Sequence, residues 1–549
     1  MQGQRNKKEK EPPAQNGPFE LRVERNVVAV RVVVRDAQGR PVPNLTQDEF
    51  RLLDSNKPQQ IIQFSIEGAS GAEGASPDAA ASPSSAAPAG MPVLPNRFVA
   101  MYFDDEMMPF ENVVRTRDAA EGYLKSALGP TDRVGIFTSS GQGDQDFTAD
   151  RAKLNDALAR LRSRGSSDAS APDCPKLSDY EAYQIAELNN PETLQLVTQR
   201  VIKCECQGNR ALCVHAETLA ESAATTRWQN AEFRVQTSLR GLDQLVQRMA
   251  MIPAQRGIVF ISPGFIANTQ LEMVDDTIDR AVRAGVVING LDSRGMWAVA
   301  PGGDISDPSP DTSPAALQSQ IDAEEVNTNV VAAVADGTGG VFFHNNNDFN
   351  AGFRQAGSLP EFAYVLVFSP ESLKLDGKYH RLKVELAASA QCRGCTVQAR
   401  RGYFAPTGNQ GAARQARQAL NDEVFSQNVT QAVPVHLSTH FSKSNSSEAH
   451  LTVEVQIAAA GLHFQQLNGA SDDQVTMVTA IFDNDGHYLK GTQKDVQLRL
   501  PKSKLTQPQS AGVSIPVEFD VAQGTYLVRE VVRDSDGTIG SANQIVQVP

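Results

Sequence analysis

The spacing of apolar residues changes near residue 96. From there to residue 344, short apolar runs alternate with longer segments in which apolar residues recur every three or four positions. The short runs predict strands buried on both faces, and the longer segments predict amphipathic helices. This alternation is typical of βαβ units, so we expect a Rossmann-like α/β domain whose mostly parallel sheet carries helices on both faces. The expected strands are 98–103, 132–140, 256–264, 285–291, 340–344 and, as the last one, 364–368.

The residues before this domain have the pattern of strands alone. Segment 18–67 is rich in valine and contains a turn at 36–40 before Pro41. With roughly 50 residues, it is marginal as an independent sheet domain. We therefore expect it to pair with a β-hairpin within 376–406, so that the α/β domain is inserted between the strands of one small sandwich.

The C-terminal part of the chain also reads as strands. About seven alternating segments lie between residues 431 and 549, with turn tetrads at Asp483–Gly486 and Asp534–Gly537. Strands at this spacing predict an immunoglobulin-like β-sandwich. Calcium loops are an alternative for the two tetrads, but neither is followed by the glutamate that closes an EF-hand.

Composition sets the remaining boundaries. We expect a polar, disordered start at 1–17, an Ala/Ser/Pro linker at 68–95 and a helical, cysteine-containing insertion at 167–235. The expected domains are an N-terminal β unit at 18–67, an α/β domain at 96–370, a hairpin region at 371–407, a connector at 408–430 and a C-terminal sandwich at 431–549.

Charge and hydropathy exclude two classes of partner. The net charge of −13 argues against nucleic acid, because phosphate binding needs a basic face. An apolar run of about 18 residues is missing, so we expect no membrane span. The Lys-rich start is not a signal peptide as it stands, but it fits the start of a mature chain whose export signal was removed.

The six cysteines form an even number in two groups. Disulfides in an extracellular, periplasmic or envelope compartment are the favoured reading, and fifteen pairings remain open. A zinc site at Cys204, Cys206, Cys213 and His215, a redox pair in the C-terminal group and free thiols in the cytosol are the alternatives. The disulfide candidates are Cys174, Cys204, Cys206, Cys213, Cys392 and Cys395.

Acidic residues follow the first strand of the α/β domain directly. Asp104, Asp105 and Glu106 come after the apolar run 98–103. In open α/β sheets, ligands bind at the carboxyl ends of the strands. We therefore expect these carboxylates to form a binding rim together with Ser262, which ends a neighbouring strand.

Several motifs together resemble a known family. FDDEMMPF ends the first strand, TDRVGIFTSSG and RGIVFISPGF contain later strands, and ARRGYFAP closes the region. In this order they resemble the von Willebrand factor A-related proteins that are widespread in acidobacteria. The resemblance covers roughly residues 19–406 and implies a von Willebrand A fold and export, whereas the molecular function of this family is mostly unassigned.

The resemblance also implies a degenerate metal-ion-dependent adhesion site. Such a site has the pattern Asp-x-Ser-x-Ser, a Thr from a second loop and an Asp from a third. Asp104 fits the leading Asp, but Glu106 and Met108 replace the two serines. Ser167 (or its neighbour Ser166) could replace the Thr of the second loop, and Ser262 occupies the position of the Asp of the third loop. Mg²⁺ or Ca²⁺ at Asp104, Glu106, Ser167 and Ser262 is thus one reading, and a vestigial edge without metal is the other.

Signals for catalysis are weak. The tempting nucleophile Ser262 is followed by Pro263, which lacks the amide that usually serves as an oxyanion donor. We expect a non-enzymatic, secreted or envelope-associated adhesion protein that binds another protein. A structural subunit that self-associates through its strands is the alternative, and a metal-dependent hydrolase is a more distant one.

Overall fold

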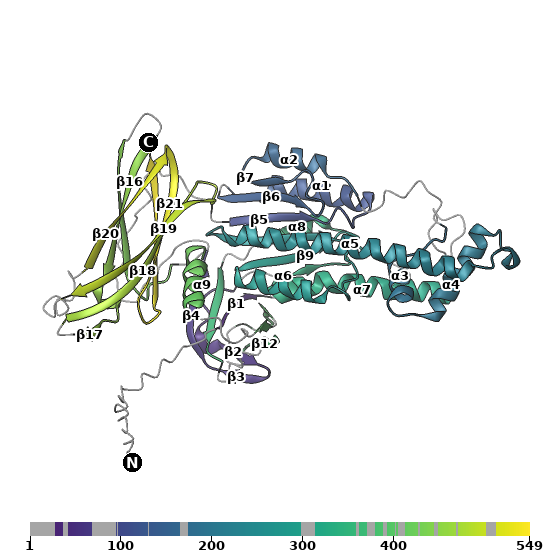
Figure 1. Ribbon diagram of the computed structural model, residues 1–549, viewed down its shortest axis with the longest axis horizontal. Helices are drawn as coiled ribbons and strands as arrows, with labels where there is room; N and C mark the ends of the chain where they lie inside the picture. The colour runs from purple at the N-terminus through teal and green to yellow at the C-terminus, as the bar shows by residue number, and fades with distance from the viewer. Residues whose placement is uncertain are drawn as a thin grey trace, which may run out of the picture.

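The computed structural model contains an α/β domain and two β-sandwich regions (Figure 1). The expectations for 1–17, for most of the linker 68–95 and for Ser167 lie outside the residues that it describes. The structure describes residues 28–36, 42–68, 95, 97–129, 131–164, 174–297, 313–357, 362–370, 379–387, 392, 394–400, 402–404, 412–426, 429–443, 448–467, 470–500 and 512–548.

The α/β domain is built on a six-stranded sheet in the order β10-β9-β8-β5-β6-β7. Neighbouring strands are parallel except for the edge strand β7, which is antiparallel to β6. Sequence analysis predicted five of these six strands but not β7. The strands are β5 (Arg97–Phe103), β6 (Asp132–Thr138), β7 (Gln145–Thr148), β8 (Gln255–Ser262), β9 (Val286–Asp292) and β10 (Phe342–Phe343).

Helices cover both faces of this sheet. Side chains of a strand alternate between its faces, so Phe98 and Tyr102 of β5 pack into one core and Met101 and Phe103 into the other. The first face is covered by α5 (Ala216–Ala250), α6 (Leu271–Arg283) and α7 (Pro314–Thr338), and the second by α1 (Phe110–Ser126), α2 (Arg151–Arg160) and α8 (Phe349–Gly357).

A helical arm extends beyond the carboxyl ends of the parallel strands (Figure 1). It comprises α3 (Asp179–Ala186), α4 (Pro191–Glu205), the short helix η2 (Arg210–Leu212) and the first half of α5. Capping residues stabilise the N-termini of α3 and α4. Ser178 forms a capping box with Glu181, and the side chain of Asn190 accepts hydrogen bonds from two backbone amides of α4.

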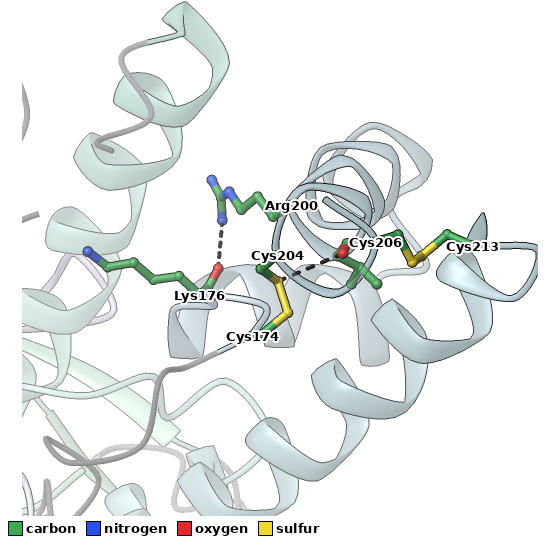
Figure 2. Close-up of a disulfide and its surroundings, with 7 residues drawn as sticks. Cys174, Lys176, Arg200, Cys204, Cys206 and Cys213 are labelled. Carbon is green, nitrogen blue, oxygen red and sulfur yellow. Dashed lines mark hydrogen bonds between the residues drawn. A yellow bond between two sulfur atoms is a disulfide. The ribbon is translucent and has the colours of Figure 1, made fainter. Parts of the chain in front are cut away.

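Two disulfides fasten the arm (Figure 2). Cys174 is bonded to Cys204, across 30 residues of sequence, and Cys206 is bonded to Cys213. A third bond joins Cys392 to Cys395, and free cysteines are absent. The prediction of disulfides is confirmed, and the zinc site, the free thiols and fourteen of the fifteen pairings are excluded for this structure.

The N-terminal strands form a sandwich with strands that follow the α/β domain. One sheet has the order β13-β1-β11-β4 and the other β14-β12-β2-β3, with one apolar core between them. The strands are β1 (Val28–Arg35), β2 (Phe50–Asp54), β3 (Lys57–Gln59), β4 (Ile61–Gly68), β11 (Phe362–Phe368), β12 (Tyr379–Leu386), β13 (Thr396–Ala399) and β14 (Gly402–Phe404), with η1 (Gln47–Glu49) before β2.

One predicted strand belongs to a different sheet than expected. Strand β11, which contains the segment 364–368, pairs with β1 and β4 of the sandwich, not with the parallel sheet. The expected hairpin is also divided, because β14 pairs with β12 whereas β13 crosses to β1 in the facing sheet. A short, fully buried apolar run has the same pattern in a parallel sheet and in a sandwich core, which explains the error.

The C-terminal region is a second β-sandwich. One sheet has the order β15-β16-β20, and the other contains β17-β18-β21-β22 with β19 paired to β18. Helix α9 (Ala412–Val424) packs on the outer face of β18 and β21. The strands are β15 (Val435–Lys443), β16 (Glu448–Ala458), β17 (Gln465–Leu467), β18 (Ala470–Phe482), β19 (Tyr488–Leu500), β20 (Gly512–Ala522), β21 (Gly524–Arg533) and β22 (Ile539–Val548), with η3 (Ala459–Gly461) after β16.

The C-terminal sandwich contacts the amino ends of the parallel strands. Arg133 at the start of β6 pairs with Asp485 in the turn between β18 and β19, at 3.1 Å. The opposite end of the sheet is thereby left to the helical arm (Figure 1). Of the helices that the structure describes, none combines the length and apolarity that a membrane crossing requires.

Candidate functional site

The candidate site lies where the connections of the parallel sheet change direction. The chain proceeds from β5 to β6 and β7 on one side, and β8 to β10 lie on the other side. Ligands of open α/β sheets bind in the crevice at such a switch point, outside the carboxyl ends of the strands. Asp104 follows β5 and Ser262 ends β8, so both residues stand at this point.

Asp104 and Ser262 are in direct contact. Ser262 Oγ donates to Asp104 Oδ2 at 2.8 Å and accepts from Gly264 N at 3.0 Å. Gly264 has a φ of +81°, and a Cβ there would lie 2.1 Å from Asn327 O of α7. A glycine is therefore required for the tight turn that holds the Ser262 hydroxyl against Asp104.

Asp104 is a buried acid with an unsatisfied oxygen. Its side chain is fully buried, and Oδ1 has no hydrogen-bond partner among the described residues. Burial raises the pKa of Asp104 to about 7, although the hydrogen bond from Ser262 favours the charged form. Near neutral pH this carboxyl group is therefore divided between its protonated and ionised forms.

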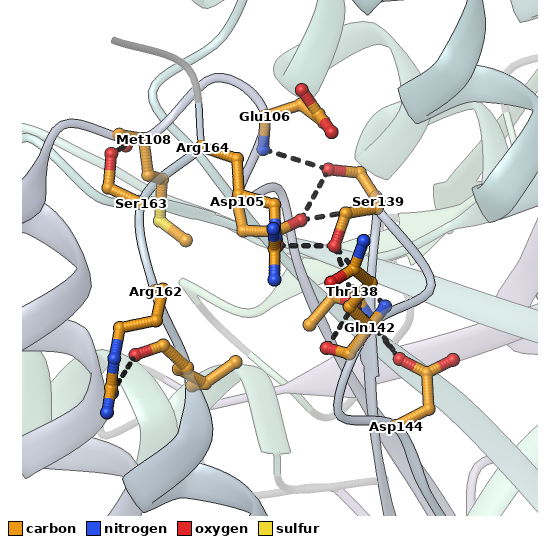
Figure 3. A network of polar contacts seen from close by, with 12 residues as sticks. Asp105, Glu106, Met108, Thr138, Ser139, Gln142, Asp144, Arg162, Ser163 and Arg164 are labelled. Carbon is orange, nitrogen blue, oxygen red and sulfur yellow. Dashed lines mark hydrogen bonds and ion pairs between the residues drawn. The ribbon is translucent and has the colours of Figure 1, made fainter. Parts of the chain in front are cut away.

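Asp105 is held by the loop after β6 (Figure 3). Its Oδ1 accepts from Ser139 Oγ and from Ser140 N, both at 2.9 Å, and its Oδ2 accepts from Ser140 Oγ at 2.6 Å. Arg164 Nε lies 3.4 Å from Oδ2 and supplies a positive charge. The basic neighbour that closely spaced carboxylates need is thus an arginine of this chain.

Glu106 and Met108 have different surroundings. Glu106 is partly exposed, and its amide donates to Ser139 Oγ at 3.1 Å. Partial burial, and then the charge of Asp105, raise the pKa of Glu106. The side chain of Met108 is buried in the core beneath α1, so its sulfur is part of the apolar packing. The backbone carbonyl of Met108 accepts a hydrogen bond from Ser163 Oγ at 2.7 Å (Figure 3).

The described side chains do not fit a hard divalent cation at this edge. Mg²⁺ prefers six oxygen ligands in octahedral geometry, and Ca²⁺ takes six to eight. Asp104 Oδ1 is the unsatisfied oxygen here, whereas both oxygens of Asp105 are already bound and Arg164 opposes a second positive charge. In the described parts of the chain, the one group of three side chains suited to share an ion lies in the C-terminal sandwich.

Three of the four residues of the expected binding rim are buried. Asp104 and Ser262 have no exposed surface, and Asp105 is 2% exposed. A macromolecular partner cannot touch these side chains, and of the four residues Glu106 alone has partial access to solvent. Their hydrogen bonds connect the ends of β5, β6 and β8, so these residues stabilise the loops at this edge of the sheet.

A pocket of about 210 Å³ lies next to this edge, between the loops after β5 and β8 and the helices α5 and α7. Its apolar wall includes Trp228 and Phe265, and its charged groups are Asp179, Arg294 and Glu324. Arg294 pairs with Asp292 at 2.8 Å and with Glu324, and Asp179 pairs with two arginines of α5. The charges around the pocket are thus largely compensated within the protein.

Four exposed apolar side chains belong to segments that follow the parallel strands. Phe110 follows β5, Leu271 follows β8, and Met296 and Trp297 follow β9. They are 66%, 59%, 64% and 37% exposed, in that order. We call these four residues the apolar rim. Each of them stands in a segment that leaves the carboxyl end of a parallel strand, which is the end where α/β domains bind their ligands.

The residues that a hydrolase would need are not assembled around Ser262. The two histidines of the α/β domain are His215 and His344. His215 caps the start of α5, about 35 Å along the helix axis from Ser238, which lies beside β5. His344 stacks on Phe342 of β10, two strands or roughly 10 Å from β8, which Ser262 ends. Neither can act as a base for Ser262.

Sequence analysis missed several residues of this edge. Ser139 and Ser140 hold Asp105, and Arg294 closes the pocket beside Asp292. A usable signal was present, because Ser139 and Ser140 end the predicted strand 132–140 and thus belong to the same edge of the sheet as Asp104. Arg164 gave no signal, since it lies in a segment without apolar periodicity.

Comparisons with known proteins identify no relative. No family model and no curated protein matches the chain. A conserved hypothetical protein, BatB from Bacteroides thetaiotaomicron, aligns with 47% of this chain and 95% of its own, at 12% identity and a TM-score of 0.22. A β-glucuronidase of glycoside hydrolase family 2 aligns with 22% of this chain at 16% identity and a TM-score of 0.16. A putative β-galactosidase from Bacteroides fragilis aligns with 21% of this chain at 21% identity and a TM-score of 0.15. The chain spans 11% and 16% of these two hydrolases, and similarities this low indicate neither a fold nor an activity.

Proposed function

We propose that this chain is an exported, non-enzymatic protein-binding protein that uses the carboxyl end of a von Willebrand factor A-type domain. The observation that carries the proposal is the apolar rim. Its four residues follow three adjacent parallel strands and lie at the end of the sheet where α/β domains bind their ligands. Aromatic residues and methionine are enriched in protein interfaces, and three of the four are of these types.

The domain type is supported by strand order together with sequence motifs. Counted from β5, the sheet order is 3-2-1-4-5-6 when read from the β7 edge, with an antiparallel edge strand. The FDDEMMPF motif provides Asp104 and Asp105 at the switch point. In our proposal the degenerate adhesion site has a structural role, because buried hydrogen bonds and Arg164 replace the ion, and the apolar rim beside it binds the partner without a metal.

Export is supported by the cysteines. The six cysteines are paired in three disulfides, two of which fasten the helical arm. Such bonds persist in oxidising compartments and are rare in the cytosol. Thiol counting in denaturant, on protein purified without reductant from its native source, tests this part: six free thiols would contradict export.

The binding proposal is tested by capture from a cell-envelope extract of the organism that makes the protein. The full chain and the variant Phe110→Asp/Met296→Asp are compared, with and without EDTA. The matched control is Leu212→Asp/Val214→Asp, which places the same two charges on exposed apolar residues of the arm, 71% and 82% exposed. We expect a partner that the full chain and the control retain and the rim variant loses, with no effect of EDTA.

Two outcomes would contradict the proposal. If the rim variant captures the partner as well as the full chain does, the apolar rim does not take part in recognition. If EDTA abolishes capture, binding depends on a metal ion. Light scattering over a concentration series tests the structural alternative, because self-association that persists in the rim variant would favour an assembly subunit over a receptor for another protein.

A further inference from the structure

The turn between β21 and β22 carries a cluster of side chains of the types that ligate metals. This turn is the tetrad Asp534–Gly537, and it lies beside His463, which follows η3. His463 Nδ1 lies 2.8 Å from Asp534 Oδ2 and 2.9 Å from Asp536 Oδ2. The ligand atoms of the three residues all lie within 4.8 Å of one another, as they would around one ion.

The two carboxylates are oriented by the backbone of the turn. Thr538 N donates to Oδ1 of both Asp534 and Asp536, at 2.8 Å in each case. One oxygen of each carboxylate is therefore fixed by the same amide, and the second oxygen of each is directed at His463. Hydrogen bonds of this kind position the ligands in protein metal sites.

A fourth acid supplies an independent indication. Asp473 of β18 is 4% exposed, and its Oδ1 accepts from Ser535 N, between the two aspartates, at 3.4 Å. Its Oδ2 is buried with no hydrogen-bond partner among the described residues. A buried carboxylate oxygen without a partner is unfavourable and calls for a cation or a bound water.

The other Asp-rich turn of the sandwich shows the contrast. In Asp483–Gly486, Asp483 accepts from two amides of its own turn and contacts His487. Asp485 pairs instead with Arg133 of the α/β domain, at 3.1 Å. The acids of that turn are thus divided between an internal contact and an arginine, whereas Asp534 and Asp536 converge on one histidine.

We propose that His463, Asp534 and Asp536 bind one divalent transition-metal ion, with Asp473 beside it. One imidazole nitrogen with carboxylate oxygens suits zinc or manganese better than calcium, which prefers oxygen ligands alone. His463 and Asp536 are 59% and 43% exposed, so the ion is reached from solvent and completes its coordination with water. In this structure His463 Nδ1 lies within hydrogen-bond distance of both carboxylates, and a bound ion would replace these direct contacts.

The test is calorimetric titration of Zn²⁺, Mn²⁺ and Ca²⁺ into the full chain, without a histidine tag and after treatment with chelator. The variants are His463→Gln and Asp536→Asn, which change exposed residues and should preserve the fold. His487→Gln in the corresponding turn is the matched control. We expect Zn²⁺ to bind, the two variants to lose roughly tenfold or more in affinity, and the control to bind as the unmodified chain does.

Other results would overturn the proposal. Absence of Zn²⁺ and Mn²⁺ binding to the unmodified chain excludes the site. Unchanged binding in His463→Gln, or a loss in His487→Gln alone, moves the ion elsewhere. Equal Ca²⁺ affinity in the unmodified chain and His463→Gln, without Zn²⁺ binding, assigns the turn to an oxygen-only site. Circular dichroism of each variant without metal distinguishes loss of a ligand from loss of the fold.

Discussion

Ser262 donates a hydrogen bond to Asp104 at 2.8 Å and so connects the ends of β8 and β5, two neighbouring parallel strands that lie 158 residues apart in sequence. Both side chains are fully buried. The pair therefore joins the two halves of the sheet at the switch point, and its energetics depend on the charge of Asp104.

Replacement of Asp104 by Asn should reduce the pH dependence of stability. Burial raises the pKa of Asp104 from 3.8 to about 7 in the folded state. Between these values the folded chain holds a proton that the unfolded chain has released, so stability falls as the pH rises from about 4 to 7 and stays lower above 7. At pH 8, Asp104→Asn should be more stable than the unmodified chain, by up to about 4 kcal/mol.

Urea unfolding at pH 5 and pH 8 measures this difference. Ser262→Ala is the matched control, because it retains the acid and removes the hydroxyl that favours its charged form, so its stability should fall more steeply with pH. Parallel pH profiles for Asp104→Asn and the unmodified chain would show that Asp104 does not titrate in this range.

Asp105 and Glu106 should differ in their effect on stability although they are neighbours. Asp105 accepts three hydrogen bonds from Ser139 and Ser140 and pairs with Arg164. Its replacement by Ala should reduce the free energy of unfolding by about 2–3 kcal/mol, because buried donors lose their acceptor. Glu106→Ala should change it by no more than about 0.5 kcal/mol. Chemical denaturation of the two variants checks the order, and equal losses would contradict it.

The fold was largely predictable where the signal is local. Apolar runs such as 98–103 and 256–264 indicate buried parallel strands, and parallel strands end at a common edge, so Asp104 and Ser262 could be placed together from the sequence. The partners of a strand are not local, which is why β11 was assigned to the wrong sheet. Burial of Asp105 could not be predicted either, because Arg164 and the loop after β6, which hold its carboxylate, come from other parts of the chain.

The two disulfides of the arm should contribute unequally to stability. The bond Cys174–Cys204 closes 30 residues of sequence, and Cys206–Cys213 closes 7. In the chain-entropy model the longer loop is worth about 3.6 kcal/mol and the shorter one about 2.4 kcal/mol. Replacing each pair by serines should therefore speed proteolysis of the arm more for Cys174/Cys204 than for Cys206/Cys213. Limited proteolysis under one protease concentration compares them, and the reverse order would show that local packing outweighs loop length.

Loss of Glu423 alone should cost more stability than loss of Glu423 together with Arg529. Arg529 of β21 is completely buried beneath α9, where Nε donates to Glu423 O at 3.0 Å and Nη1 to Asn543 Oδ1 at 3.1 Å. The carboxylate of Glu423 lies 3.5 Å from Nη2 and also accepts from Ser541 Oγ at 2.6 Å. Burial lowers the pKa of Arg529 to about 10, and the charge of Glu423 opposes this decrease.

Removal of one partner leaves a buried charge with less compensation. Glu423→Ala should therefore destabilise the sandwich by about 3 kcal/mol or more, whereas Arg529→Met/Glu423→Ala, which removes both charges from an apolar setting, should recover much of that loss. Thermal unfolding of both variants and of Arg529→Met completes a double-mutant cycle. Additive losses in the double variant would mean that the two side chains stabilise the sandwich independently, and that α9 is held mainly by the apolar contacts of Leu420 and Val424.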